Sequence, residues 1–442
     1  MSEPLQCMGM PAVFVTPLQR LSSIAPGFAA AAEAVLSGAV LLHTPESFVA
    51  FVRSYSPKTG LKAALIPSDA FACCAASGGL LHALRLTLRT EELFAESHGL
   101  HLPILPPPTG SATHSSLQVA LSTEQVDCAL AHMLFCAKVP LESEWGYQSV
   151  HDLSHPATVA ALLSHFAAAP SATASARALV LTRVRVRSSP VAAAGGAAVA
   201  AAGGAAAAAA TPAAPPPAAP STIASLLAAC PATTALPAVA FSRTPGPVRV
   251  LFSDSLIGGG TLAHGCTQEE VLLRQQPTAL AALLLAQRME STEAIALALP
   301  SGAQLIAMDA FPFAVVPDAC QHSPQWVEHE ASKALAGFLA AAASATPPPA
   351  SVSTAAWGCG TFGGDTALKF CLQWLAAALA GMQEVVWETA WNSFEADARR
   401  IVGALGQGSP QQLWAKALEY RVEGAEQTFL EFITGASTRS LV

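Results

Sequence analysis

Short apolar segments of strand character alternate with longer helical segments from about residue 223 onward. The strand-like segments are rich in valine, isoleucine and alanine and are bounded by glycine, proline or polar residues; they are 235–241, 248–253, 293–299, 303–311 and 383–391. Between them, residues 267–289 and 365–381 carry apolar side chains at helical spacing. Strands that alternate with helices predict an α/β sandwich.

The preceding part of the chain, from about residue 26 to residue 166, has mainly helical spacing. Its best-marked helix follows Ser122, which can cap the helix, and Gln125 can reach back as the capping-box partner. A second helix is predicted over 78–94, and Pro156 begins a third at a position where its missing N–H costs nothing. A chain of 442 residues has room for two to three domains. We therefore predict a helical accessory domain over residues 1–177.

Residues 178–187 change period. Valine alternates with arginine there, which predicts a strand that leads into the α/β domain. The arginines at 183, 185 and 187 are interpreted as part of a solvated strand edge. A small basic strip that holds a polymer is the alternative.

Residues 188–222 form a low-complexity insertion of alanine, glycine and proline. The segment is almost uncharged and has no amphipathic period, so we predict disordered or loosely helical chain without a chemical role. Residues 191–210 have the length of a membrane span, but four glycines interrupt them and two valines are their only large aliphatic side chains. A membrane span is therefore not favoured, and the N-terminus does not resemble a secretory signal.

Charge and cysteine usage exclude several function classes. The net charge of −8 argues against a basic face for polyanions, so we expect no direct nucleic-acid binding. The ten cysteines include no CxxC pair, which favours reduced thiols and argues against a zinc ribbon. His151 and His155 have the spacing of helical metal ligands, but Pro156 places the helix start after them. No metal site is predicted.

The stretch GGGTLAHGCTQEE, residues 258–270, carries the chemistry. Three glycines after a strand and before a helix can form a nest for phosphate, although such a run is more often only a turn. Glu269 and Glu270, adjacent near the helix start, would ordinarily complement the helix dipole. The two features in one loop indicate a site. His264 within this loop is interpreted as a solvated residue, and Cys266 and Cys359 as small packing residues.

The spacing of GGG, seven residues and QEE resembles a signature of the poly(ADP-ribose) glycohydrolase family. WGCGTFGGDTALKFCLQWLAAALAG, residues 357–381, resembles that family's second motif, and the helical segments upstream resemble its N-terminal region. The resemblance implies a macrodomain-like three-layer α/β/α sandwich with a mixed sheet over residues 223–442, preceded by the all-helical accessory domain. It also implies an enzyme that needs neither a metal nor another cofactor.

The resemblance further implies roles for individual residues. Glu270 would be the general acid that protonates the leaving ribose hydroxyl and then the base that activates water, and Glu269 would bind ribose hydroxyls. Neighbouring carboxylates and a ligand diphosphate should raise the proton affinity of Glu270. Substrate contacts are implied for a diphosphate loop, a positioning glutamine, a second loop that closes over the diphosphate, and a phenylalanine that packs on the ribose: Asp254, Gly258, Gly259, Gly260, Gln268, Trp357, Gly358, Cys359, Gly360, Thr361 and Phe362.

Several positions depart from the family pattern. Leu251 stands where the family usually has an aspartate, and Asp254 where it has an asparagine. Ala356 replaces an asparagine before the second motif. The interval that would carry a tyrosine clasp, STEAIALALPSG, contains no tyrosine. Trp387 and Trp391 are the two candidates for stacking on adenine.

The sequence thus predicts a poly(ADP-ribose) glycohydrolase that releases ADP-ribose. A weak or inactive macrodomain reader of ADP-ribose is the alternative, and a scaffold that binds a protein partner through its helical region is a third class. The expected partners are poly(ADP-ribose) chains on modified proteins, with no membrane. A monomer in the nucleus, the cytoplasm or both is expected.

Overall fold

The computed structural model describes most of the chain, in two compact units that interleave along the sequence. The first comprises 1–103, 119–181 and 256–288, and the second 104–118, 182–255 and 289–442. The residues described are 25, 27–57, 59–94, 105, 108–109, 112–137, 153–168, 179–187, 222–231, 233–263, 265–390, 393–422 and 427–435. Residues 188–221 of the predicted low-complexity insertion, including the span weighed as a membrane segment, lie outside them. The predicted domain boundaries remain predictions.

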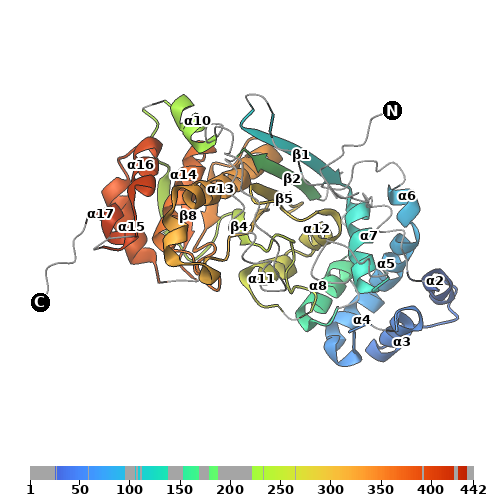
Figure 1. The fold of residues 1–442 in the computed structure, drawn as a ribbon. Helices are drawn as coiled ribbons and strands as arrows, with labels where there is room; N and C mark the ends of the chain where they lie inside the picture. Colours follow the sequence, from blue (N-terminus) through green and yellow to red (C-terminus); the bar gives the residue numbers. More distant parts are fainter. Residues whose placement is uncertain are drawn as a thin grey trace, which may run out of the picture. The chain divides into compact units, whose positions relative to one another are not determined.

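The first unit is helical. Its helices are α2 (Phe28–Leu36), α3 (Pro45–Tyr55), α4 (Ser68–Ala76), α5 (Gly79–Leu88), α6 (Thr90–Phe94), α7 (Thr123–Leu134), α8 (Pro156–Ala167), α11 (Gln268–Gln275) and α12 (Ala282–Leu285), with 3-10 turns η1 (Ala63–Leu65) and η3 (Pro277–Ala281). Helix α5 lies beside α7 and α8, and α4 packs on α8 (Figure 1). Buried aromatic rings of α2, α3 and the end of α7 form the core; they include Phe28, Tyr55 and Phe135.

The capping signals in the sequence predicted two of these helices correctly. The Ser122 side chain accepts a hydrogen bond from the Gln125 N–H, and the Gln125 side chain accepts from the Ser122 N–H, which begins α7. Pro156 is the first residue of α8. The prediction of a single helix over 78–94 is wrong, because the helical conformation is interrupted at Arg89, between α5 and α6.

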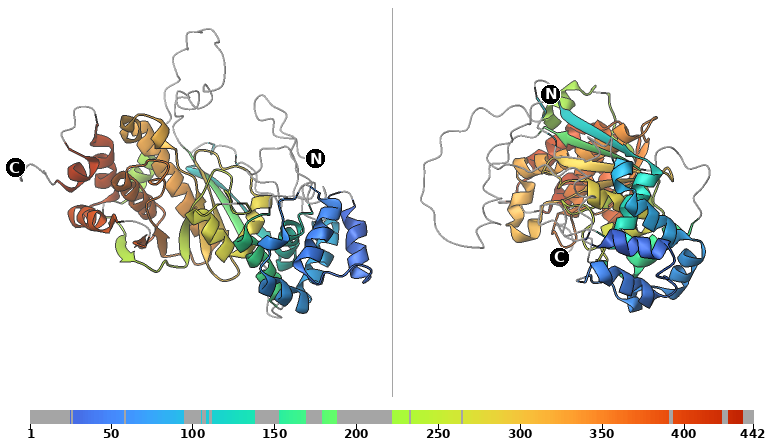
Figure 2. Two further views of the ribbon diagram at one scale, coloured as in Figure 1. Left: turned by 90° about the horizontal axis from the view of Figure 1, so that it is seen from below. Right: turned by 90° about the vertical axis from the view of Figure 1, so that its right-hand side faces the viewer.

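The second unit is organised by an eight-stranded mixed sheet in the order β1-β2-β5-β6-β4-β7-β8-β3 (Figures 1 and 2). The strands are β1 (His114–Leu121), β2 (Leu179–Val186), β3 (Ala238–Ser242), β4 (Val248–Phe252), β5 (Glu293–Ala298), β6 (Gln304–Met308), β7 (Ser351–Thr354) and β8 (Glu384–Glu388). Strands β6, β4, β7, β8 and β3 pair in parallel, whereas β5 is antiparallel to β6. The predicted α/β fold is confirmed.

Several elements of this unit were not predicted, among them β1, β7, the helix over 324–344 and the helices after residue 394. Strand β1 lies in a region whose spacing was interpreted as helical; its side chains alternate between exposed and more buried positions. Helix α13 (Pro324–Ser344) packs along β5, β6 and α14 (Thr366–Leu379). Gly337 allows the close approach of α13 to the sheet, since a Cβ there would lie 2.9 Å from Ile306 Cγ2. The remaining elements are α10 (Thr222–Ala229), α15 (Glu395–Leu405), α16 (Pro410–Glu419), α17 (Phe429–Thr434), η4 (Phe313–Val315) and η5 (Asp318–His322).

The central strands are buried on both faces. Val250 and Ile306 belong to the core that α13 and α14 share with the sheet. Leu251 and Ala307, which point to the other face, are also fully buried. Burial on both faces is typical of the central strands of an α/β sandwich.

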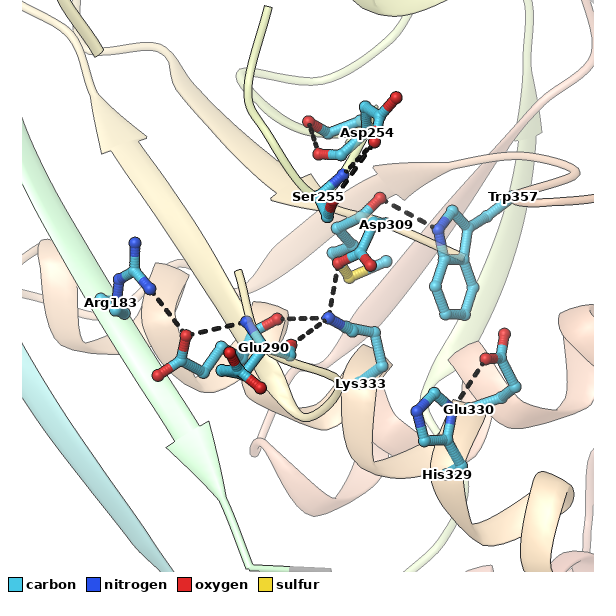
Figure 3. Close-up of polar contacts among 12 residues, drawn as sticks. Arg183, Asp254, Ser255, Glu290, Asp309, His329, Glu330, Lys333 and Trp357 are labelled. Carbon is cyan, nitrogen blue, oxygen red and sulfur yellow. Dashed lines mark hydrogen bonds and ion pairs between the residues drawn. The ribbon is translucent and has the colours of Figure 1, made fainter. Parts of the chain in front are cut away.

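The arginines of β2 are not part of a solvated edge, so that interpretation is wrong. Strand β2 lies between β1 and β5, and the Arg183 side chain is fully buried. Its Nη1 donates to Glu293 Oε2 at 2.6 Å (Figure 3). Arg185 Nη1 donates to the Leu105 carbonyl at 2.5 Å. The guanidinium groups therefore satisfy interior acceptors.

Among the described residues, no single helix is long and apolar enough to cross a membrane. The pair α4 and α5 meets the length and composition criteria only when taken together, and a bend of 72° separates the two helices.

Candidate active site

Gly258 to Gly260 form a tight loop after β4. Gly258 and Gly259 have φ values of 119° and 42°, which non-glycine residues rarely adopt. The loop is closed by the Thr261 N–H, which donates to the Gly258 carbonyl at 2.9 Å, and by the Gly265 N–H, which donates to the Gly260 carbonyl at 2.8 Å. The backbone therefore requires glycine at the first two positions.

Glu270 joins this loop to the start of α11. The helix begins at Gln268, close to the predicted start at residue 267, and Thr267 is its N-cap. Glu270 Oε2 accepts from the Thr267 N–H at 2.5 Å and from its hydroxyl at 2.6 Å. The other oxygen, Oε1, accepts from the Gly260 N–H at 2.6 Å. The carboxylate thus caps the helix and anchors the glycine loop.

Glu269 also accepts a hydrogen bond from a backbone N–H of the glycine loop, two residues before the one that Glu270 binds. Its Oε1 accepts from the Gly258 N–H at 2.7 Å. Glu269 and Glu270 are 3% and 6% exposed, and a Cβ on Gly259 would lie within 3.0 Å of an oxygen of each. The two acids therefore flank one glycine. In this structure the carboxylates occupy the N–H groups of Gly258 and Gly260 that were expected to bind a diphosphate.

The proton affinity of Glu270 is low in the protein alone. Burial raises the pKa of this carboxyl, but the hydrogen bonds from Thr267 and Gly260 and the charge of Arg274 outweigh burial, so the pKa lies below its usual value. The expected rise concerns the protein with a bound diphosphate and stays a prediction; in the protein alone, the donors around the carboxyl hold its pKa down. Without ligand, Glu270 is a carboxylate at neutral pH.

Three residues that hold this loop were not recognised in the sequence. Arg274, one turn after Glu270, donates to the Gly265 carbonyl and, at 3.0 Å, to the Thr158 hydroxyl. The Thr158 hydroxyl donates to the Thr261 carbonyl at 2.5 Å. A Cβ on Gly265 would overlap the Glu270 carboxylate. The spacing of Arg274 four residues after Glu270 on one helix face was the available signal.

The sequence also singled out Gln268, Cys266 and three histidines. Gln268 is half-buried and Cys266 is exposed. His155 caps α8, where its Nδ1 accepts from the Ala157 N–H at 3.2 Å. His264 and His151 lie outside the described residues. No group of three histidine, cysteine or acidic side chains suited to a metal occurs among the residues that the structure describes.

Asp254 lies two residues beyond β4 in the second unit. Asp254 Oδ1 accepts hydrogen bonds from the Ser255 N–H at 2.7 Å and from the Ser255 hydroxyl at 3.3 Å (Figure 3). Leu251, which stands where the family usually has an aspartate, is fully buried within β4 and presents no polar group. Position 254 therefore presents a carboxylate, and position 251 presents only an apolar side chain.

The second predicted loop, residues 357–362, follows β7. Its Trp357 side chain is fully buried, and its Nε1 donates to the Met308 carbonyl at 3.2 Å (Figure 3). Burial raises the pKa of Cys359 to about 12, as expected for a packing residue. Gly358 is half-buried, Gly360 and Thr361 are exposed, and Phe362 is half-buried against the core. Gly360 and Thr361 are therefore the exposed residues of this loop.

The other positions that depart from the family pattern are the clasp interval, Ala356 and the two tryptophan candidates for adenine stacking. Residues 291–302 form β5 and the tight turn into β6, which leaves no segment for a clasp there. Ala356 is partly buried. Trp387 is fully buried against Phe370 and Phe394, so it presents no face for adenine. Trp391 lies outside the described residues.

A mixed α/β sheet with glycine-rich loops after β4 and β7 is the fold of a macrodomain-like protein, and the helix that begins at Gln268 carries an acid pair in its first turn. The family comparison agrees. Residues 240–299 and 300–394 match the family described as "Poly (ADP-ribose) glycohydrolase (PARG), Macro domain fold". Over residues 240–394 the chain therefore matches the poly(ADP-ribose) glycohydrolase family.

Two curated relatives are similar to this chain over part of their length. "Probable poly(ADP-ribose) glycohydrolase 2" from Arabidopsis thaliana is 25% identical over 259 residues, which covers 43% of this chain and 49% of the relative. "Poly(ADP-ribose) glycohydrolase 1" from Caenorhabditis elegans is 28% identical, over 30% of this chain and 22% of the relative. The chain thus spans about half of the first relative and less of the second.

A solved structure gives a weaker likeness. The crystal structure of the glycohydrolase from Thermomonospora curvata aligns with a TM-score of 0.30 and 16% identity, and covers 44% of this chain and 82% of that one. This alignment carries no part of the family assignment.

Proposed function

We propose that the protein hydrolyses ribose–ribose O-glycosidic bonds of poly(ADP-ribose) and releases ADP-ribose. The observation that carries the proposal is the pair of buried first-turn carboxylates, Glu269 and Glu270, fixed at the glycine loop by the N–H groups of Gly258 and Gly260. The family match supports the same reaction class. Poly(ADP-ribose) chains on modified proteins are the proposed partners, and the nucleus or cytoplasm the proposed location.

The proposed mechanism assigns both proton transfers to Glu270. Its carboxyl protonates the leaving ribose oxygen as the bond between that oxygen and the anomeric carbon of the other ribose breaks. The resulting carboxylate then removes a proton from the water that attacks this anomeric carbon. Negative charge on Glu269 stabilises the oxocarbenium-like transition state. The chemistry proposed here needs no metal.

Glu270 must gain a proton before it can act as the acid. In the protein alone, donors from Thr267 and Gly260 keep its pKa low. A diphosphate that takes the Gly260 N–H removes one of these donors and adds negative charge nearby. Both changes raise the pKa of Glu270, so we propose that substrate binding itself prepares the acid.

A reader that binds ADP-ribose without cleaving it is the second candidate. Three observations favour it: Leu251 is buried and apolar, Asp254 replaces an asparagine, and β5 with its turn occupies the interval of the clasp. An aspartate accepts but does not donate when ionised, so Asp254 cannot give the amide hydrogen bond of an asparagine.

Release of ADP-ribose from labelled poly(ADP-ribose) by the purified protein, with ADP-ribose binding measured in parallel, separates the two functions. The proposal predicts binding and sustained release. Binding without release above the buffer rate would establish the reader, and the absence of both would reject both functions. The assay should include Glu269→Gln, for which we expect a loss of about 100-fold in release.

A further inference from the structure

Lys369 is a fully buried lysine directly beneath the second glycine-rich loop. It belongs to α14, and its side chain and that of Glu330 on α13 are each 2% exposed. Its Nζ donates to Glu330 Oε2, and Glu330 Oε1 contacts His329 Nδ1 at 3.0 Å. A buried ammonium requires such a compensating carboxylate.

The loop lies on this ammonium. Lys369 Nζ is 3.7 Å from the centroid of the Trp357 ring, which is close for a cation–π contact. Gly358 adopts φ 73°, and a Cβ there would lie 3.2 Å from Nζ and 2.6 Å from Ala310 Cβ. A Cβ on Gly364 would lie 3.2 Å from Lys369 Cε. The lysine therefore packs against the Trp357 ring and lies close to the backbone of Gly358 and Gly364.

Lys333 shows what a buried lysine with a framework role looks like in the same unit. Its Nζ donates to the carbonyls of Glu290 and Glu293 at 2.7 and 2.8 Å and to Asp309 Oδ1 at 2.5 Å (Figure 3). These acceptors tie α13 to β5 and β6. Lys369 instead pairs with one carboxylate, that of Glu330, and lies against the Trp357 ring and the glycines of the loop. Its contacts are therefore with the loop and not with the strands.

We propose that Lys369, held by Glu330, is the positioning residue that fixes the conformation of the loop 357–362. Glu330 fixes the ammonium from α13, the ammonium packs under the Trp357 ring, and the ring sets the path of the following glycines. Burial holds the pKa of Lys369 well below its usual value, although the negative charge of Asp309 opposes that effect. The ion pair with Glu330 stabilises the ammonium that the aromatic face requires. The consequence for ligand affinity rests on the proposed function of this loop in substrate binding.

Hydrogen–deuterium exchange of the peptide that spans residues 355–364 tests the proposal without any ligand. The double variant Lys369→Met/Glu330→Gln removes both charges and leaves neither orphaned. Loss of a desolvated cation–π contact predicts faster exchange in this peptide by up to about 30-fold, the fold-change that about 2 kcal/mol represents. Lys333→Met, an equally buried lysine without contact to the loop, should leave this peptide within about twofold of wild type.

Ligand affinity gives the second arm. If the wild type binds ADP-ribose, the double variant should bind it about 10- to 30-fold more weakly, whereas Lys333→Met should change the affinity less than about threefold. If the wild type does not bind, the proposed function fails, and the exchange arm alone judges the role of Lys369.

Two outcomes overturn the proposal. One is unchanged exchange at 355–364 in a folded double variant; the other is a uniform increase across all peptides, which would show a general loss of stability. If the double variant does not fold, Glu330→Gln alone decides, because it leaves the lysine in place. Faster exchange confined to 355–364 is expected there, and unchanged exchange contradicts the proposal.

Discussion

Gly265→Ala should displace the Glu270 carboxylate without touching either acid. A Cβ at position 265 would lie no more than 2.5 Å from both carboxylate oxygens of Glu270 and from the carbon between them. Gly265 is not among the glycines with positive φ, so alanine there avoids the penalty of the left-handed region. The substitution therefore acts through the clash with Glu270.

The cost follows from the hydrogen bonds that the displaced carboxylate loses. Glu270 accepts from the Thr267 N–H, the Thr267 hydroxyl and the Gly260 N–H, at 2.5 to 2.6 Å. Hydrogen bonds to a charged group are worth about 1.5–3 kcal/mol each, and water replaces part of that once the carboxylate moves outward. We expect the free energy of unfolding to fall by about 2–4 kcal/mol. ADP-ribose release should fall about 100-fold or more, because the acid no longer occupies its position.

Urea denaturation and ADP-ribose release measured on the same preparations check this prediction. Gly403→Ala in α15 is the matched control, since a Cβ there meets nothing within 4 Å. That substitution should raise the stability by about 0.5–1 kcal/mol and leave release unchanged. A Gly265→Ala protein with wild-type stability and wild-type release would refute the described packing of Glu270 against the loop.

Three further predictions concern the described residues. Folding lowers the pKa of Glu270, so the ionised carboxylate stabilises the protein at pH values above its unfolded pKa, near 4.5. This stabilisation is lost as the pH falls through the lower folded pKa. The difference in unfolding free energy between wild type and Glu270→Gln, measured by urea titration, should therefore shrink below about pH 4.5. Arg183→Met leaves Glu293 charged and buried, which should lower the free energy of unfolding by about 3–5 kcal/mol. An unchanged melting temperature in thermal unfolding would contradict the buried ion pair. At pH 8, iodoacetamide should label the exposed Cys266 and spare Cys359, whose pKa is raised to about 12; rapid labelling of Cys359 in peptide mass spectra would argue against its burial.

Local signals predicted the elements whose ends are set by local contacts. Ser122 and Gln125 form the expected capping box, Pro156 begins α8, and Thr267 caps the helix that carries the acid pair. Strand segments such as β4 and β6 combine a short apolar run with turn residues, so their pattern was sufficient. These features depend on residues near one another in sequence.

The features that the sequence did not predict depend on partners far along the chain. Helix α13 combines an alanine-rich sequence with Glu330 and Lys333, which resemble solvated residues until their partners Lys369 and Asp309 are known. Arg183 resembled an edge residue because Glu293, its partner, is 110 positions away. The lowered pKa of Glu270 likewise results from the donors that converge on it from the folded loop.

The rate of ADP-ribose release by Glu270→Gln relative to wild type tests the central claim most directly. Glu431→Gln is the matched control, because Glu431 makes the same capping-box contacts with Thr428 at the start of α17. The proposed mechanism predicts a loss of about 100- to 10,000-fold for Glu270→Gln, and wild-type release for Glu431→Gln. Release by Glu270→Gln at the wild-type rate would contradict the assignment of the general acid to Glu270.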